Sequence, residues 1–210
     1  MTEETIDHWP PAAEVARLFS EPGGTFYIPP ADLQNKLESI GGFILDWDGV
    51  FHEGHKAEGG ISAFSEADSM GLNMLRYGYW RKHKRLPVMA IISGENNRAA
   101  IALAKREHFH SVYTRTGNKR LALDDLCNAA VIEPNRVLCV FDDINEIPMV
   151  EHCGVRFMVR RNASPLLSYY LEQNERVEYR TANSGGRHAV RECCEFILGM
   201  WGTVKQVIQS

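Results

Sequence analysis

The fold of this chain is decided by the stretch GFILDWDGV at residues 42–50. Three large apolar residues follow one another at 43–45 without polar alternation, which is typical of a strand buried on both faces. Asp46 and Asp48 stand at its end and point to the same side, because side chains alternate along an extended chain. The first can attack an electrophile such as phosphorus, and the second can carry a proton. Gly49 lets the chain turn away without crowding a substrate.

An Asp-x-Asp pair alone is weak evidence, because solvated turns and calcium sites carry it too. A second apolar run, Val88–Ile92, ends at Ser93 and Gly94, before a helix that we expect over 96–107. A hydroxyl and free backbone N–H groups at a helix start can hold a phosphate oxygen. Ser93 would also be a good N-cap for that helix, which is the alternative role. Both interpretations place Ser93 at the end of a buried strand.

A third apolar run, Val137–Phe141, ends in the acids Asp142 and Asp143. Before it we expect a short strand at 111–114 and a helix that begins at Lys119. The lysine would place a fixed positive charge near the strand ends, although a lysine at a helix start is also common on a solvated surface. Carboxylates, a hydroxyl and a cation thus follow successive strands.

This order predicts an α/β fold with a doubly wound parallel sheet, whose carboxyl edge collects the strand ends. Asp46, Asp48 and Asp142 would repel one another there, since a like-charged pair about 4 Å apart costs about 4 kcal/mol at an effective dielectric of about 20. We therefore expect a cation among them. Oxygen ligands beside a phosphate favour Mg²⁺ over zinc or copper.

At this point the chain resembles the haloacid dehalogenase-like phosphatases, within them the small capless group of 3-deoxy-manno-octulosonate 8-phosphate phosphatases. Its short motifs follow in the family's order, and they are Asp46–Val50, Ser93-Gly94, Lys119 and Asp142-Asp143. The segment Ser184–Glu192 is similar to the Gly-Gly-x-Gly-Ala-Val-Arg-Glu segment that closes those enzymes. The resemblance covers roughly residues 42–199 and implies a Rossmann-like core without a large cap domain.

The resemblance also implies an activity, that of a phosphomonoesterase that works through an aspartyl phosphate. Asp46 would be the nucleophile, and Asp48 the acid and base. Lys119, the third catalytic residue, would hold the transferring phosphoryl group together with Ser93 and Gly94. Phosphoryl transfer depends mainly on in-line positioning and on neutralising the phosphoryl oxygens, which agrees with these roles.

The metal and the rest of the substrate site follow from the same resemblance. Mg²⁺ would be bound by the carboxylates of Asp46 and Asp142 and by the backbone carbonyl of Asp48, with Asp143 close behind. Arg187, in the closing segment, is a further candidate for binding the substrate or its phosphate.

Departures from the family's pattern bear on the substrate. Glu95 follows the second motif where the family has arginine, and Leu103 stands at the position of another family arginine. An acidic sugar phosphate would then be bound differently, with Arg98 or Lys105 compensating, or not at all.

Other departures concern the metal shell and the assembly. Phe141 replaces the glycine before the fourth-motif acids, and Glu146 replaces the later aspartate, changes that we expect to reshape the metal shell without removing it. His52 and Glu53 replace the usual threonine and aspartate. The segment 54–60 is shorter than the β-hairpin with which the family builds its tetramer.

Length and charge narrow the class of protein. The chain has 210 residues and a formal net charge of −4 at pH 7, so we expect one phosphatase domain of ordinary size over 41–210. The negative charge and the lack of a basic stripe argue against nucleic acid as a partner. No apolar stretch approaches the about 20 residues of a membrane span, and the N-terminus has no signal-peptide core. We expect a cytoplasmic protein.

Residues 1–40 are expected to be a helical extension. Short helices are predicted over Pro11–Ser20 and Pro30–Ser39, because proline favours the first turn. Aromatic residues of this segment would dock it onto the core or a neighbouring subunit, and an interaction arm is the alternative. At the other end, the last helix is expected to continue through Leu198–Ile208.

The helix expected over Phe64–Trp80 covers the sheet, and no block of sequence is large enough for an independent cap. A capless site is open, so we expect a homo-oligomer, a tetramer by resemblance, to shield it. The expected substrate is a sugar phosphate, either 3-deoxy-manno-octulosonate 8-phosphate or a 9-phosphorylated nonulosonate. Alternatives are a catalytically weak binding or regulatory subunit, and a phosphotransferase that uses the same intermediate.

Overall fold

The chain folds around one mostly parallel sheet, in a computed structural model that describes residues 9–56 and 62–209. Within these residues the sheet has seven strands in the order β1-β7-β6-β5-β2-β3-β4, and only β1 runs antiparallel to its neighbour. The strands are β1 Thr25–Phe26, β2 Gly42–Asp46, β3 Val88–Ile92, β4 Ser111–Tyr113, β5 Val137–Phe141, β6 Val155–Arg160 and β7 Tyr179–Ser184. The expected doubly wound α/β sheet is confirmed.

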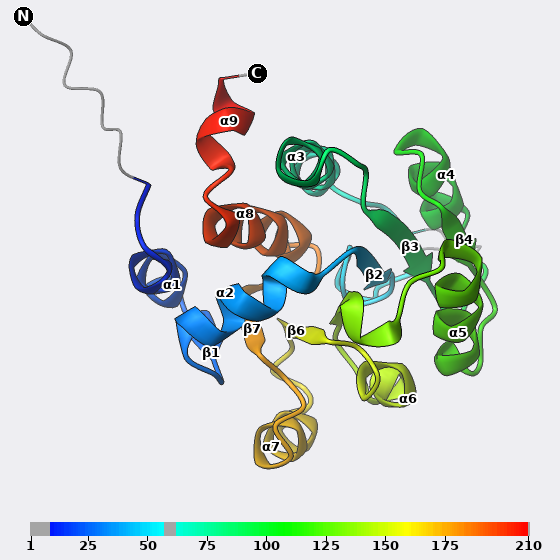
Figure 1. Cartoon of the computed structure of the whole chain (residues 1–210). Helices are drawn as coiled ribbons and strands as arrows, with labels where there is room; N and C mark the ends of the chain where they lie inside the picture. Colours follow the sequence, from blue (N-terminus) through cyan, green and yellow to red (C-terminus); the bar gives the residue numbers. More distant parts are fainter. Residues whose placement is uncertain (1–8, 57–61, 210) are drawn as a thin grey trace, which may run out of the picture.

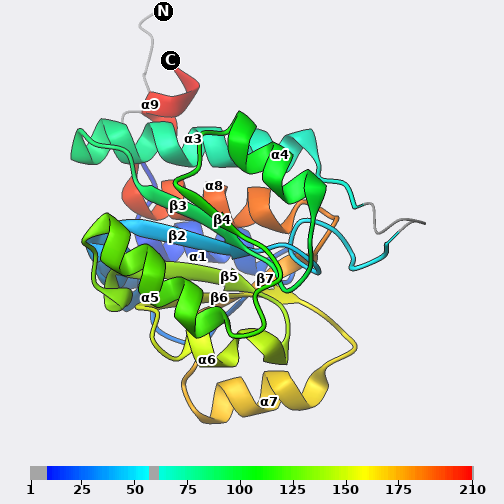
Figure 2. The ribbon, with the colours of Figure 1, turned by 90° about the vertical axis from the view of Figure 1, so that its right-hand side faces the viewer.

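Helices cover both faces of the sheet (Figures 1 and 2). The α-helices are α1 Ala12–Ser20, α2 Pro30–Ser39, α3 Glu66–His83, α4 Arg98–Arg106, α5 Lys119–Ala130, α6 Ile147–Val150, α7 Pro165–Gln173, α8 Ala189–Trp201 and α9 Val204–Ile208, with short 3-10 turns η1 Pro134–Arg136 and η2 Ile144–Glu146. Alternate residues of β2 serve the two faces, because Phe43 and Leu45 pack in the core with α2, α3 and α8, whereas Ile44 packs with α5, α6 and α7. The central strand is therefore buried on both sides, as its unbroken apolar run predicts.

Glycines allow α3 to lie close to α8. A Cβ atom on Gly78 would stand 2.2 Å from a methyl of Leu198, and one on Gly71 would stand 3.0 Å from the Cα of Arg191. At its start, α3 is capped by the Ser65 hydroxyl, which accepts from Ala67 N at 3.0 Å. The helix expected at 64–80 is confirmed and runs slightly further.

The segment before Gly41 packs on the same layer as α3 and α8. Both predicted helices are confirmed as α1 and α2, and β1 extends the sheet at its β7 edge. Leu33 and Leu37 are fully buried, and the Lys36 ammonium lies 2.7 Å from the buried Glu178 carboxylate. The N-terminal extension is thus part of the core packing, while its boundary at residue 40 stays a prediction.

One expectation about the C-terminal end is wrong. The last helix does not continue through Leu198–Ile208, because Gly202 adopts φ +66° and ends α8, after which α9 starts in a new direction. Trp201 is buried, whereas Ile208 on α9 is 73% exposed, so the two do not form one packed stripe.

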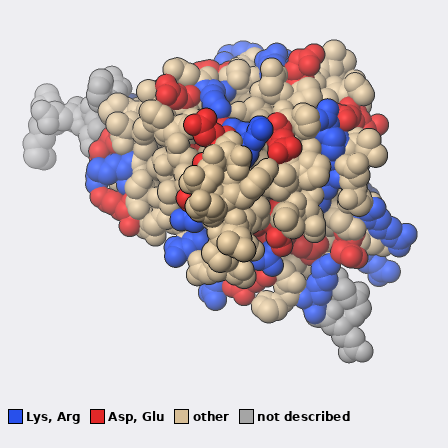
Figure 3. Space-filling view, turned by 90° about the horizontal axis from the view of Figure 1, so that it is seen from below, with Lys and Arg blue, Asp and Glu red and all other residues tan. Residues whose placement is uncertain are grey.

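Two further observations concern the surface charges and the hydropathy of the helices. Acidic and basic side chains are interspersed over the face shown in Figure 3. In the described residues, no helix has both the length and the apolarity that crossing a membrane requires.

The hairpin that was expected to be short at 54–60 falls partly on residues 57–61, outside the described ranges.

Replacement of Leu37 by alanine is expected to lower the free energy of unfolding by about 2–5 kcal/mol, because the side chain is fully buried between α2 and the core. Chemical denaturation measures the change. The matched control is Leu18→Ala on α1, where the side chain is 48% exposed, and its effect should be much smaller. Equal effects would contradict the docking of the N-terminal segment.

Candidate active site

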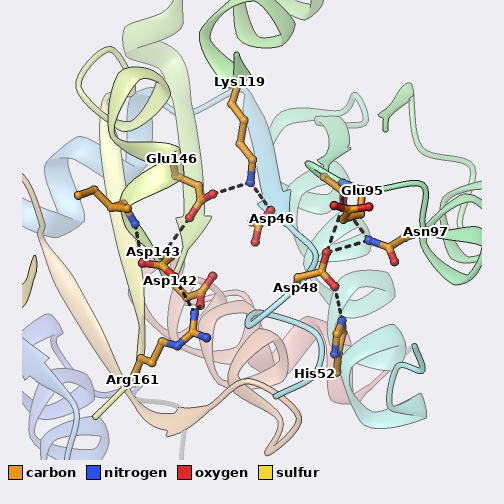
Figure 4. A network of polar contacts seen from close by, with 12 residues as sticks. Asp46, Asp48, His52, Glu95, Asn97, Lys119, Asp142, Asp143, Glu146 and Arg161 are labelled. Atoms are coloured by element: carbon orange, nitrogen blue, oxygen red, sulfur yellow. Dashed lines mark hydrogen bonds and ion pairs between the residues drawn. The ribbon is translucent and has the colours of Figure 1, made fainter. Parts of the chain in front are cut away.

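The ends of β2, β3 and β5 bring the predicted residues to one edge of the sheet (Figure 4). Asp46 is the last residue of β2 and Asp48 follows it, while Gly94 follows β3 and Asp142 follows β5. With Lys119 they line a pocket of about 500 Å³. The doubly wound topology alone explains the gathering, because parallel strands present their carboxyl ends at the same edge.

Lys119 is the charge that holds the buried acids together. Its ammonium forms ion pairs with the carboxylates of Asp46 and Glu146, and all three side chains are at most 6% exposed. Burial alone would lower the pKa of Lys119, but the carboxylates of Asp46 and Glu146 outweigh burial and raise it. The lysine therefore stays charged, beside the carboxylate oxygen that was predicted to attack phosphorus.

Asp48 lies half-buried on the other side of the pocket. Its Oδ2 accepts from Asn97 Nδ2 at 2.9 Å and from the Ser93 hydroxyl at 3.4 Å. His52 Nε2 and Lys56 Nζ lie 3.0 and 3.5 Å from its Oδ1. Burial would raise the pKa of Asp48, but the contacts with His52, Asn97 and Lys56 outweigh it and hold the pKa at about 2. In the free protein at neutral pH, Asp48 is consequently ionised and can accept a proton.

The alternative role of Ser93 as the cap of α4 is wrong. The helix begins later than expected, with Asn97 as its N-cap residue. The Ser93 hydroxyl is fully buried, and it accepts from Asn97 Nδ2 at 2.8 Å and from Glu95 N at 3.2 Å. Ser93 is thus fixed in the turn between β3 and α4, where its hydroxyl reaches Asp48. Its predicted contact with a phosphoryl group, and that of Gly94, stay predictions.

Three buried carboxylates form a site that fits a divalent cation. Asp46, Asp142 and Glu146 each offer an oxygen, and these atoms lie within 4.8 Å of one another. Burial raises the pKa of Asp142 to about 7, with the Glu146 carboxylate acting in the same direction. Burial likewise raises the pKa of Asp46 well above its ordinary range, despite Lys119. A hard cation would relieve this repulsion, and an all-oxygen donor set suits Mg²⁺.

Gly49 is required where the loop that carries Asp48 passes the Asp142 carboxylate. It adopts φ +89°, a conformation that side-chain-bearing residues rarely adopt, and a Cβ atom there would lie 2.0 Å from Asp142 Oδ2. The loop carrying Asp48 can therefore approach the Asp142 carboxylate only with glycine at this position.

Two residues of the site were not among the sequence candidates for binding. Glu146 was noted as a departure from the family, yet its carboxylate reaches Lys119 and also accepts from Asp143 N at 2.9 Å. A capping box from Asp143 to Glu146 is readable in sequence and could have indicated this position. Arg161, which follows β6, contacts Asp142 and lies 3.1 Å from Asp143 Oδ2. Arg161 could have been found in the sequence from its position directly after a parallel strand.

Arg187 lies apart from the acids. It is exposed, its Nε lies 3.1 Å from Glu53 Oε1, and it lines a neighbouring cavity of about 420 Å³ that we call the side hollow. The residues lining the side hollow are Gly49, Glu53, Arg160–Ala163, Ala182–Gly185 and Arg187. The predicted role of Arg187 in phosphate binding stays a prediction.

Arg98 and Lys105, which were expected to compensate for the missing family arginines, do not line the pocket of the acids. Glu95, in contrast, does line it. Leu103 is fully buried in the core. On the α4 side of the pocket, these two residues therefore provide no positive charge to bind an acidic sugar.

Taken together, the pocket is lined by the carboxylates of Asp46 and Asp48, the ammonium of Lys119 and a group of acids that fits a cation. This combination suits in-line displacement at phosphorus, in which charge on the phosphoryl oxygens must be neutralised and one proton moved.

Replacement of Gly49 by alanine is expected to weaken Mg²⁺ binding at least tenfold and to lower thermal stability, because the new methyl group would collide with the Asp142 carboxylate. Calorimetric Mg²⁺ titration and thermal unfolding measure the two effects. Gly117→Ala is the matched control, since a Cβ atom at Gly117 has no atom within 4 Å. Unchanged Mg²⁺ affinity in the folded Gly49 variant would contradict the proposed metal site.

Comparisons with known proteins place this geometry in a family. No family model matches the chain. In sequence it is 31% identical over 179 residues to the 3-deoxy-D-manno-octulosonate 8-phosphate phosphatase of Escherichia coli K12, across 83% of this chain and 88% of that protein. The solved phosphatase of the same name from Yersinia pestis has a TM-score of 0.70 at 26% identity, covering 83% of this chain and 89% of that one.

A third similar structure is the phosphatase of that name from Moraxella catarrhalis, determined in complex with a magnesium ion, a phosphate ion and a KDO molecule. It has a TM-score of 0.71 at 24% identity, covers 85% of this chain and 97% of that one, and supports the fold. Three observations lead to the same family, namely the identity to the Escherichia coli protein, the capless sheet and the order of the motifs. This chain belongs to the 3-deoxy-D-manno-octulosonate 8-phosphate phosphatase family of the haloacid dehalogenase-like phosphatases.

Proposed function

We propose that the protein hydrolyses a sugar phosphate with Mg²⁺ and an aspartyl-phosphate intermediate. The observation that carries the proposal is the buried lysine that bridges Asp46 and Glu146, with Asp48 facing the same pocket. Taking this lysine and its two carboxylates out of water costs free energy that their pairing offsets only in part. Neutralising a phosphoryl group gives the chain a reason to keep them that a weak binding subunit lacks.

In the first half-reaction, an Asp46 carboxylate oxygen attacks phosphorus and forms the acyl phosphate as the bond to the sugar oxygen breaks. The departing alkoxide takes a proton from Asp48. Because the pKa of Asp48 is about 2 in the free protein, it must first gain that proton as substrate binds. The negative charge of the incoming phosphate favours the protonated form of a neighbouring carboxyl group.

In the second half-reaction, a water molecule attacks the acyl phosphate while Asp48 accepts its proton. Phosphate leaves and the Asp46 carboxylate is restored. Asn97 and His52 hold the Asp48 carboxylate in place for both steps. A sugar hydroxyl in place of water would give a phosphotransferase, and the two activities share the first half-reaction.

Asp46, Asp142 and the backbone carbonyl of Asp48 would hold Mg²⁺, which would supply positive charge to the phosphoryl oxygens. Ser93, Gly94 and Lys119 would contact the same oxygens. The fold is shared with the Moraxella catarrhalis phosphatase, whose structure was determined with a magnesium ion and a phosphate ion.

The proposed substrate is 3-deoxy-D-manno-octulosonate 8-phosphate, the substrate in the names of the relatives, or a 9-phosphorylated nonulosonate. We also propose a cytoplasmic enzyme that assembles as a homo-oligomer, a tetramer by the family resemblance. The open pocket supports assembly, because a second subunit would shield the acyl phosphate from adventitious water.

Phosphate release from a panel of sugar phosphates, including the octulosonate 8-phosphate and 9-phosphorylated nonulosonates, tests the function. The wild type with Mg²⁺ should turn over at least one acidic sugar phosphate, and Asp46→Asn should lose at least 1,000-fold in kcat because it lacks the nucleophile. A folded Asp46→Asn variant with most of the wild-type rate would refute the mechanism. Product analysis with added sugar acceptors separates hydrolysis from transfer.

Removal of divalent ions by a chelator should abolish most phosphate release, and added MgCl₂ should restore it. The reason is that the buried acids around Asp142 then lose their neutralising charge. Activity and Mg²⁺ binding are measured on the same chelated sample. Full turnover in the absence of divalent ions would rule out the metal requirement.

A further inference from the structure

The side hollow adjoins the pocket of the catalytic acids. Arg161 lines both cavities, and Gly49, the residue after Asp48, lines the hollow. The loops after β6 and β7 form its remaining walls. A phosphomonoester bound at Asp46 therefore has room of about 420 Å³ beside the reacting group for part of its sugar.

Positive charge in the side hollow exceeds negative charge. Arg160, Arg161 and Arg187 line it, against the single carboxylate of Glu53. Arg187 is paired with Glu53, and Arg161 is paired with Asp142 and Asp143. Arg160 is different, because no carboxylate of the described residues forms an ion pair with it.

The contacts of Arg160 leave its charge uncompensated. Its Nε lies 3.4 Å from the side-chain oxygen of Asn162, and its Nη1 lies 3.5 Å from the backbone oxygen of Ala182. These neutral acceptors orient the guanidinium without cancelling its charge. The single positive charge of Arg160 would be balanced by a carboxylate, which carries one negative charge. A second phosphate group on the substrate would carry nearly two.

The position of Glu95 fixes the direction in which an anionic group can point. In Figure 4, Glu95 and Arg161 lie on opposite sides of Asp46 and Asp48. A carboxylate of the substrate would be repelled on the Glu95 side and attracted on the side of the arginines. The substrate therefore has one electrostatically favoured orientation.

We propose that the side hollow is an anion subsite in which Arg160 binds a carboxylate on the leaving group of the phosphomonoester. This inference rests on the proposed phosphatase function and names the group of this chain that selects an acidic sugar. Arg160 would supply the positive charge for the substrate carboxylate that neither Arg98 nor Lys105 supplies. The guanidinium suits the task, because its planar donors match the two oxygens of a carboxylate.

Binding of the free sugar acid 3-deoxy-D-manno-octulosonate and of its methyl ester tests the subsite. The ester removes the negative charge and adds one methyl group, so the change in the ratio of the two affinities between wild type and Arg160→Gln reports on the contact with the carboxylate. Calorimetry on the Mg²⁺-loaded wild type should give at least tenfold tighter binding of the acid. Arg160→Gln should bind both compounds equally, and Arg160→Lys should recover part of the preference.

The matched control is Arg81→Gln, since Arg81 is an exposed arginine on α3 that lines neither cavity. It should keep the wild-type ratio, and thermal unfolding should show all variants folded. An acid preference that persists in Arg160→Gln, or is absent from the wild type, overturns the subsite. Failure of the phosphatase proposal is seen separately, as a lack of phosphate release by the wild type.

Discussion

The ion pairs of one buried ammonium with two buried carboxylates are the interaction on which this active site depends. Lys119 joins Asp46, from the end of β2, to Glu146, from the turn after β5. Removing one member would leave an uncompensated buried charge, which typically costs about 3–5 kcal/mol. The same charge that stabilises this edge of the sheet also lines the pocket, where we propose that it contacts a phosphoryl group.

The acids differ in their readiness to lose a proton, and their surroundings explain why. Asp48 is half-exposed and surrounded by donors, so its pKa lies at about 2. Asp142 is buried among other carboxylates, so its pKa rises to about 7. One end of the pocket is thus suited to moving protons, and the other is suited to holding a cation. Similar residues acquire different roles because burial and neighbouring charges differ over a few ångströms.

The sheet and the principal acids could be predicted from the sequence, because uninterrupted apolar runs ending in Asp46, Ser93 and Asp142 are local signals. The start of α4 and the break at Gly202 were missed, since both depend on backbone conformation that apolar periodicity does not encode. Arg160 and Arg161 were not identified as site residues, because their position at the end of β6 was the only local signal. Their proximity to Gly49 and Asp142 arises from the packing of loops that are distant in sequence.

The contact of Gly185 with the catalytic loop has a consequence for how the enzyme comes to be active. A Cβ atom at Gly185 would lie 2.1 Å from the backbone oxygen of Gly49, so the turn after β7 rests directly on the loop that carries Asp48. A chain emerging from the ribosome supplies the two aspartates early and this support late. The loop that carries Asp48 therefore gains this contact only after the turn that follows β7 has been synthesised.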